Sequence, residues 1–162
     1  MVAPRAAPKR VLSLLNGGLA DPDAPLLHVD DLSVLRGEGV FETLLVVGDK
    51  PVELEAHLAQ LGRSAAMLEL PAPDLTAWRA CVRRAIQAWS GEPPEMVLRV
   101  VLTRGRDPAA GGCPHAVGYA LGEPVAPTVL AQRRDGVAAL TLTRGIGPWP
   151  VTPRGCCWVA RR

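Results

Sequence analysis

The spacing of apolar residues changes once along residues 40–89, and this change restricts the fold more than any other feature of the sequence. From Val40 to Val47 the side chains alternate between two faces, as in a β-strand. Gly48 then begins a turn, so residues 40–53 are typical of a hairpin. Beyond the hairpin, apolar residues recur at helical spacing in two stretches. We therefore predict two amphipathic helices, one carrying Leu54, Leu58, Leu61, Ala65 and Leu68, the other carrying Leu75, Trp78, Val82, Ala85, Ile86 and Trp89.

Local signals set the limits of these elements and add further strands. Pro71 ends the first helix, and Asp74 is a suitable N-cap for the second. Strands separated by two helices predict an α+β fold, an antiparallel sheet covered by those helices. We expect a loose tail at 1–10, an α+β domain at 11–123, a linker at 124–132 and the start of a second domain at 133–162. The other strands are expected at 11–15, 96–103, 116–121 and 136–143.

Composition excludes several classes of function. The chain has 162 residues, of which 48% are apolar and 21% charged, which is typical of a globular protein. A formal net charge of +2, with arginines scattered among acids, gives no basis for nucleic-acid binding. The apolar runs are far shorter than the ~20 residues of a membrane span. The four cysteines include no C-x-x-C pair, and we expect Cys81 to be a buried thiol in a reducing, cytoplasmic compartment.

Two neighbouring motifs carry a family resemblance. The first is Arg36-Gly37-Glu38-Gly39-Val40-Phe41-Glu42-Thr43, and the second is His57-Leu58-Ala59-Gln60-Leu61-Gly62-Arg63-Ser64-Ala65. Together they resemble the small amino-terminal domain of fold-type IV pyridoxal-phosphate enzymes. These class IV enzymes include branched-chain and D-amino-acid transaminases and aminodeoxychorismate lyases. The resemblance covers roughly residues 11–150. Within it, the sequence from Asp30 to Gly37 looks most like that of the lyases.

The resemblance implies a cofactor and a catalytic lysine. Pyridoxal phosphate acts as an electron sink for a carbanion at the substrate α-carbon, and a lysine holds it as a Schiff base. The only lysines in the chain are Lys9 and Lys50, and both lie outside the place where the family keeps that lysine. We therefore expect no catalytic residue in this chain and no covalently bound cofactor, although the intact family uses pyridoxal phosphate.

The position that binds the cofactor phosphate in the family differs in this chain. Similar enzymes place an arginine at the position of Gln60, where the guanidinium grips the phosphate. A neutral amide lacks that charge-assisted contact. Arg63 lies one helical turn further on and is the candidate substitute, with a surface salt bridge as its alternative role.

Three other residues are substrate-binding candidates. Phe41 occupies the position that lines the cavity in similar enzymes, against the alternative of plain core packing. Arg99 interrupts an apolar strand and needs a carboxylate partner; basic residues there face the substrate cavity in the family. Arg104 is the third, with orientation of the following loop as its alternative role. His57 is interpreted as a structural residue that hydrogen-bonds across the domain. Gly37 and Gly39 are interpreted as residues that allow a tight backbone path into the strand.

The end of the chain departs from the family. After Trp149 the resemblance leads to a small-residue loop and the Schiff-base lysine, but the chain reads Cys156-Cys157-Trp158-Val159-Ala160-Arg161-Arg162. One choice of codons for this segment, read in another frame, gives Leu-Leu-Gly-Gly-Ala-Lys, which resembles the lyase sequence before that lysine. We hypothesise an out-of-frame tail from about residue 152.

The sequence thus predicts a truncated aminodeoxychorismate lyase-like protein, inactive by itself. The resemblance implies conversion of 4-amino-4-deoxychorismate to 4-aminobenzoate and pyruvate in folate synthesis. A branched-chain or D-amino-acid aminotransferase is the first alternative, and a non-catalytic interaction or dimerisation domain is the second. The expected partners are an amino-acid-like small molecule and a second copy in a homodimer, with no nucleic acid and no membrane.

Overall fold

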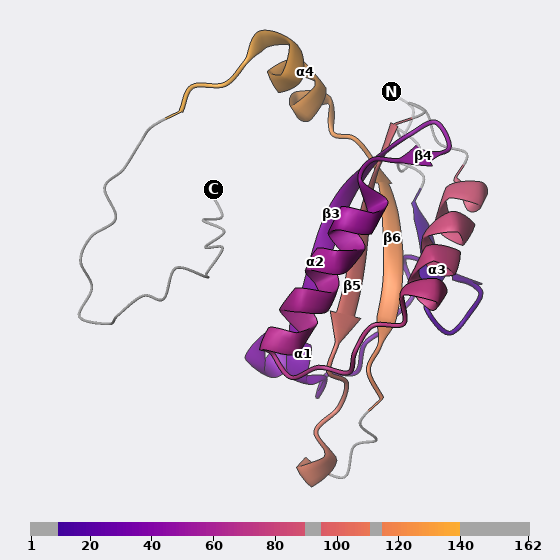
Figure 1. Cartoon of the computed structure of the whole chain (residues 1–162), viewed down its shortest axis with the longest axis vertical. Helices are drawn as coiled ribbons and strands as arrows, with labels where there is room; N and C mark the ends of the chain where they lie inside the picture. Colours follow the sequence, from indigo (N-terminus) through magenta and orange to yellow (C-terminus); the bar gives the residue numbers. More distant parts are fainter. Residues whose placement is uncertain (1–9, 90–94, 111–114, 140–162) are drawn as a thin grey trace, which may run out of the picture.

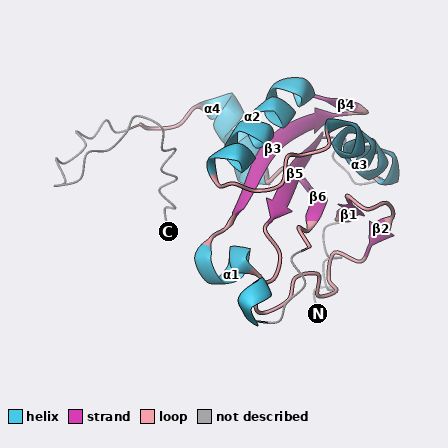
Figure 2. Cartoon of the chain, turned by 60° about the horizontal axis from the view of Figure 1, so that its bottom comes forward, coloured by secondary structure: helices cyan, strands magenta, loops and turns pink. Residues whose placement is uncertain are grey.

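The computed structural model describes residues 10–89, 95–110 and 115–139. Six antiparallel strands form one sheet in the order β2-β1-β6-β5-β3-β4. Helices α2 and α3 lie side by side over one face of this sheet (Figure 2). The α+β fold and its two covering helices are therefore as predicted. The strands are β1 (Val11–Leu14), β2 (Leu19–Ala20), β3 (Gly39–Val47), β4 (Lys50–Pro51), β5 (Glu95–Thr103) and β6 (Gly118–Pro124).

The covering helices form where the sequence predicts them. Helix α2 spans Leu54–Met67, and helix α3 spans Leu75–Ala88. The carboxylate of Asp74 accepts hydrogen bonds from the backbone N–H groups of Thr76 (2.8 Å) and Ala77 (3.2 Å), so Asp74 is the predicted N-cap. The apolar stripes of both helices pack on alternate residues of the central strands. The resulting core contains Leu44, Val46, Leu58, Leu61, Ala65, Trp78, Val82, Ala85, Met96, Leu98, Val100 and Ala120.

Two further helices were not predicted. Helix α1 (Leu32–Arg36) begins after Asp31, whose carboxylate accepts a hydrogen bond from the backbone N–H of Ser33 at 2.8 Å. It is only five residues long and has a single buried residue, so it leaves no helical period in the sequence. Helix α4 (Pro127–Asp135) has no buried residue and stands away from the sheet in Figure 1. Like α1, it therefore leaves no clear helical spacing of apolar residues in the sequence.

The segment predicted to be a linker, residues 124–132, contains Pro124 at the end of β6 and most of α4. Its role as a linker stays a prediction, but part of it is helical. Pro127 suggested a break, but proline is tolerated in the first turn of a helix, where its missing N–H would have no partner in any case. The strand expected at 136–143 is not found over residues 136–139, and its remainder lies outside the described residues. The proposed domain boundary therefore remains a prediction.

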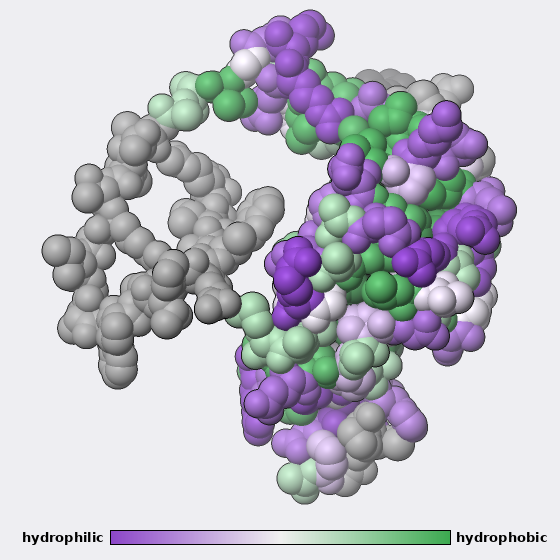
Figure 3. Space-filling view, viewed as in Figure 1, coloured by the Kyte–Doolittle hydropathy of each residue, from purple (hydrophilic) through white to green (hydrophobic). Residues whose placement is uncertain are grey.

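None of the described helices is long and apolar enough to cross a membrane. The side of the domain that carries α2 and α3 presents mostly hydrophilic side chains, with hydrophobic ones showing between the two helices (Figure 3). Cys81 lies on the buried side of α3, as predicted, and its thiol donates to the carbonyl oxygen of Ser13 at 3.3 Å. Burial raises the pKa of this thiol.

Candidate functional site

The sheet has a second face, which no described helix covers. We call it the uncovered face and define it by the residues of β3, β5 and β6 that alternate with the core. The strand register arranges these side chains in rows across the three strands. Phe41, Val101 and Tyr119 form the first row, Thr43, Arg99 and Leu121 the second, and Leu45, Val97 and Glu123 the third.

Arg99 lies in the middle of the uncovered face. Its guanidinium Nη1 is 3.9 Å from Glu123 Oε2, a distance too long for a hydrogen bond. The Arg99 side chain is 43% exposed and that of Glu123 36%. The sequence expectation that Arg99 has a carboxylate neighbour is therefore confirmed, but the contact leaves its N–H donors available. A guanidinium surrounded by apolar side chains is suited to binding the carboxylate of a ligand.

Phe41 shares this face with Arg99. The ring is 51% exposed, although the adjacent Val40 on the same strand is buried in the core. The alternative of core packing for Phe41 is thus wrong. Tyr119 completes the row at its other end, and sequence reasoning missed it. The signal that could have found it is its place as the only tyrosine of the chain, inside a predicted strand.

Arg104 lies away from the uncovered face, in contacts that fix the backbone. Its guanidinium pairs with Glu38 and donates to the carbonyl oxygens of Leu68 and of Glu69, the latter at 3.1 Å. These bonds join the turn before β3 to the end of α2. This geometry favours an orienting role over substrate contact for Arg104.

The glycines of the first motif serve the backbone, as interpreted from the sequence. Gly37 caps α1 with φ of 69°, in the left-handed region that favours glycine. A Cβ on Gly39 would lie 3.2 Å from the carbonyl oxygen of Leu102 and 3.1 Å from Cβ of Ser33. The close approach at Gly39 lets the start of β3 pair with the end of β5, and Gly37 ends α1 just before it.

The residues of the second motif lie on α2, over the opposite face of the sheet. His57 Nδ1 is 3.0 Å from Glu42 Oε2, so His57 has the structural role predicted for it. Arg63 donates to Gln60 Oε1 from Nε (3.1 Å) and Nη2 (2.6 Å), and Gln60 Nε2 donates to Ser64 Oγ at 3.3 Å. Among the described residues Arg63 has no salt bridge, contrary to its alternative role. Gln60 and Arg63 are thus together, but apart from Phe41 and Arg99.

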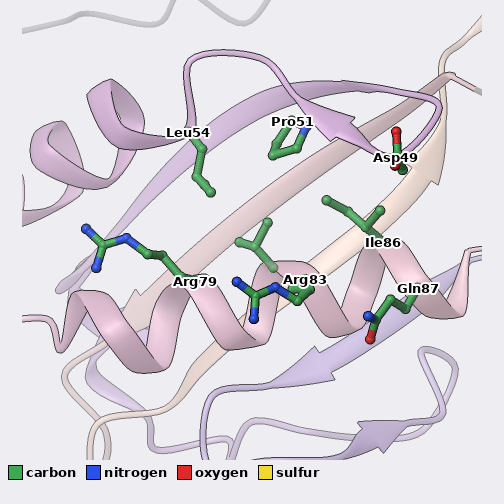
Figure 4. A pocket seen from close by; sticks show the side chains of 8 residues that line it. Asp49, Pro51, Leu54, Arg79, Arg83, Ile86 and Gln87 are labelled. Atoms are coloured by element: carbon green, nitrogen blue, oxygen red, sulfur yellow. The ribbon is translucent and has the colours of Figure 1, made fainter.

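A cavity of about 360 Å³ lies on the helix side, between α3, the start of α2 and the β3–β4 turn (Figure 4). Arg79 at its edge is already held by Glu55, with both guanidinium contacts at 2.7–2.8 Å. This contact lowers the pKa of the exposed Glu55 carboxyl. None of the residues predicted to bind cofactor or substrate lines the cavity. Within the described part of the chain, no cluster of His, Cys, Asp or Glu could hold a metal ion.

Comparison with known proteins now identifies the family. Residues 39–145 match the family model described as amino-transferase class IV. The chain belongs to the class IV aminotransferase family. This stretch contains β3, β5 and β6, so the family match includes the uncovered face together with α2 and α3.

Individual class IV relatives agree with this assignment. The chain is 46% identical over 133 residues to the bifunctional aminodeoxychorismate lyase / D-amino acid transaminase of Mycobacterium tuberculosis, a match that covers 82% of this chain and 45% of that protein. The solved PLP-bound form of a hypothetical aminotransferase from the same organism is 42% identical with a TM-score of 0.77, covering 85% of this chain and 48% of that one.

A third relative extends the comparison to another genus. The fold IV-transaminase CpuTA1 from Curtobacterium pusillum is 32% identical with a TM-score of 0.62, and the match covers 71% of this chain and 42% of that chain. The chain therefore spans about half the length of the relatives it matches.

Members of the family use pyridoxal phosphate, and the described residues fit one side of such a site. The uncovered face offers Arg99 among apolar and aromatic side chains, which suits a substrate carboxylate. Among the described residues the lysine is Lys50, and it pairs with Val47 at the hairpin end of the sheet, away from the row of Arg99. Gln60 supplies only a neutral amide, and its position as the phosphate site stays a prediction of the family resemblance. The described residues thus fit substrate contact and do not fit covalent attachment of the cofactor.

Proposed function

We propose that this chain is the substrate-facing part of an aminodeoxychorismate lyase-like enzyme, which converts 4-amino-4-deoxychorismate to 4-aminobenzoate and pyruvate. The observation that carries the proposal is the placement of Arg99 at the centre of an apolar sheet face that the described helices leave uncovered. The relative named a bifunctional aminodeoxychorismate lyase / D-amino acid transaminase supports the choice of reaction.

Each residue on the uncovered face has a defined part in this proposal. Arg99 binds and orients a substrate carboxylate. Phe41 gives an apolar wall that limits the access of water to the bound substrate. Arg104 and Glu38 hold the turn from which β3 starts and so fix the position of Phe41. Pyridoxal phosphate, when bound in a complete enzyme, supplies the electron sink.

The proposal includes the prediction that the 162-residue chain by itself has no lyase or transaminase turnover. Lys50 lies on an exposed hairpin turn, and Lys9 lies outside the described residues. The experiment incubates the chain with pyridoxal phosphate and borohydride and then maps any labelled lysine. We expect no stoichiometric label and no formation of 4-aminobenzoate. Turnover together with labelling of Lys50 would contradict the proposal.

The reading-frame hypothesis concerns residues from about 152, which lie outside the described residues. It remains a proposal, and the DNA beyond codon 150 tests it: another frame should encode a Gly-Ala-Lys segment and a further lysine-bearing domain. Restoring that frame should restore cofactor binding. If no other frame encodes such a domain, the hypothesis fails and the interaction-domain alternative is favoured.

Cofactor affinity in a restored protein provides a second test, on α2. Replacing Gln60 by arginine adds a charge-assisted contact for the cofactor phosphate. Such a bond contributes about 1.5–3 kcal/mol, so we expect roughly tenfold to hundredfold tighter binding. The control is Gln87→Arg, which adds the same charge to α3, on the far side of the cavity in Figure 4. Equal effects of the two changes would contradict a phosphate site at Gln60.

An aminotransferase remains the second candidate, because the same relative is also named a D-amino acid transaminase. The loop after Arg104 lacks the Arg-x-His pattern associated with D-amino-acid transaminases. Assays of the restored protein with aminodeoxychorismate, and with D-alanine and 2-oxoglutarate, would distinguish the two activities.

A further inference from the structure

The cavity on the helix side of the domain has no part in the proposed function. Its volume of about 360 Å³ lies within the range of small-molecule sites, roughly 300–1,000 Å³. The β3–β4 turn, the start of α2 and one side of α3 form its walls, so it is separated by the sheet from the uncovered face (Figure 4). The lining residues are Asp49, Pro51, Leu54, Arg79, Val82, Arg83, Ile86 and Gln87.

The middle of this cavity is apolar. Leu54 points into it from the start of α2, and Ile86 points into it from α3 (Figure 4). Both side chains are partly buried and pack against the core, and Val82 beside them is 1% exposed. Such a lining favours the hydrocarbon part of a ligand, because contact removes apolar surface from water on both sides.

Two residues of the lining carry opposite charges that are not paired. Arg83 is exposed, and its guanidinium makes no hydrogen bond or ion pair with the described residues. The same holds for the carboxylate of Asp49 in the β3–β4 turn. Arg79 differs, because Glu55 holds its guanidinium in two hydrogen bonds at 2.7–2.8 Å. A cation and an anion therefore line one cavity without contacting each other.

These two charges lie apart along the cavity. Figure 4 shows Asp49 at the end where Gln87 lies. The guanidinium of Arg83 points toward the other end, where Arg79 lies. Arg83 and Gln87 are four residues apart on α3, which is about 6 Å along the helix axis. The arginine side chain adds to this separation, because long side chains of a helix point toward its N-terminus. A ligand that reaches both charges must therefore be extended.

We propose that this cavity binds a linear ω-amino acid, a molecule with an amine at one end, a carboxylate at the other and a short hydrocarbon chain between them. The carboxylate accepts hydrogen bonds from the guanidinium of Arg83, and the ammonium group donates to the carboxylate of Asp49. The hydrocarbon chain lies against Leu54 and Ile86. An α-amino acid carries both charges on one carbon atom, so it reaches only one of the two partners. The inference does not depend on the proposed function, because the cavity and the uncovered face lie on opposite sides of the sheet.

The experiment titrates the isotopically labelled chain with 6-aminohexanoate and follows backbone amide shifts by NMR. Norleucine is the matched probe, because it is an isomer of 6-aminohexanoate with both charges on one carbon atom. Hexanoate lacks the amine, and hexylamine lacks the carboxylate. We expect 6-aminohexanoate to shift amides of α3, of the start of α2 and of the β3–β4 turn. The other three compounds should bind at least about threefold more weakly, because each loses one charged contact.

Two variants assign the charges of the ligand to their partners. Arg83→Gln should weaken 6-aminohexanoate binding about threefold to fivefold without weakening hexylamine binding. Asp49→Asn should have an effect of the same size without weakening hexanoate binding. The control is Arg134→Gln, which removes an exposed arginine of α4 that does not line the cavity. It should leave binding unchanged.

Several outcomes would overturn the proposal. These are the absence of amide shifts in α3 up to the solubility limit of 6-aminohexanoate, equal affinities for norleucine and 6-aminohexanoate, and the original affinity in Arg83→Gln. Both variants should keep the amide spectrum of the folded chain, because the replaced side chains are exposed and make no bond with the described residues. A restored protein that forms no 4-aminobenzoate would contradict the proposed function alone and would leave this cavity site intact.

Discussion

The two faces of the sheet are made by alternate residues of the same strands, but they differ in how completely they are packed. On β5, Leu98 is fully buried under the helices, and the side chain of the adjacent Arg99 is 43% exposed. On β3, Val40 is 7% exposed and Phe41 is 51% exposed. The covered face has an apolar partner layer within the chain. The uncovered face combines apolar, aromatic and charged side chains, as surfaces that bind ligands or other protein layers do.

The comparison teaches that stability and function are separable along one strand. The covered face resembles any two-layer α+β core, in which shape and volume decide the contribution of a residue. The uncovered face contributes little to that core, so its residues are available for recognition. The predictions below test this separation, in order of decreasing expected effect.

The largest difference is expected between two neighbouring residues of β5. Leu98→Ala creates a cavity in the core and should lower the free energy of unfolding by about 2–5 kcal/mol. Val97→Ala, on the uncovered face, removes less buried area and should cost about 1 kcal/mol or less. Urea denaturation of both variants measures the two values. Equal costs would show that the uncovered face is packed as tightly as the covered one.

Two arginines, Arg104 and Arg99, should also differ in how much they contribute to the free energy of unfolding. Arg104→Ala removes the bonds to Glu38 and to the last carbonyls of α2, and should lower the free energy of unfolding by about 1–2 kcal/mol. Arg99→Ala should change it by no more than about 0.5 kcal/mol, because its contact with Glu123 is long and partly exposed. The denaturation midpoints of the two variants test this. A larger loss for Arg99→Ala would contradict the separation.

Alkaline pH should lower the stability of the chain through one group on each face. These groups are the Cys81 thiol in the core of the covered face and the Tyr119 phenol on the uncovered face. In the folded chain the pKa of Cys81 is raised above its ordinary value of 9.0, and that of Tyr119 above its ordinary value of 10.0. The unfolded chain keeps the ordinary values, so as pH rises both groups ionise in the unfolded chain while they stay protonated in the folded one. Their stabilising contributions are complete below those unfolded values and are lost as pH rises through the folded ones. Each group lowers the free energy of unfolding by at most about 1.4 kcal/mol per pH unit in this range.

The variants assign this slope to the two groups. Cys81→Ala should flatten the fall in stability between pH 9 and 10, and Tyr119→Phe the fall above pH 10, where those unfolded values apply. Unfolding free energies measured by urea at several pH values provide the test. An unchanged slope in Cys81→Ala would show that the thiol ionises equally well in both states.

The smallest effect is expected at Glu123. Its carboxylate is the internal competitor for Arg99, so Glu123→Gln should strengthen binding of 4-aminobenzoate, the product of the proposed reaction, by about twofold to fivefold. The free energy of unfolding should stay within about 0.5 kcal/mol of the original. An NMR titration of the isotopically labelled chain measures the affinity. Weaker 4-aminobenzoate binding in this variant would mean that Glu123 helps to hold Arg99 in place.

Sequence patterns predicted the covered face well. The alternation from Val40 to Val47 assigned Phe41 and Thr43 to one face and Glu42 and Leu44 to the other, as observed. Helices α2 and α3 were predictable because their stripes are long and Asp74 is a clear cap. Helices α1 and α4 were missed because neither is long enough, nor buried enough, to impose a period.

The candidate site was only partly predictable. Arg99 could be recognised because a charge inside an apolar strand needs a partner, but the identity of that partner depends on the register of β5 with β6. Arg104 was grouped with the substrate-binding residues because its contacts with Glu38 and with the end of α2 bridge more than thirty positions of sequence. Tyr119 belongs to no local motif, and only the strand register places it in one row with Phe41.

The order of the strands also determines when the domain can form during synthesis. β1 is translated first, yet its long-range partner is β6, with Leu14 opposite Tyr119 about a hundred positions later. Closing a loop of this length costs roughly 4 kcal/mol of chain entropy before the pairing is made. The hairpin, α2, α3 and β5 can associate earlier, while β1 keeps one edge unpaired. A ribosome must therefore release residues up to about 124 before the sheet is complete, and until then the nascent chain presents a strand edge open to chaperones or to other chains.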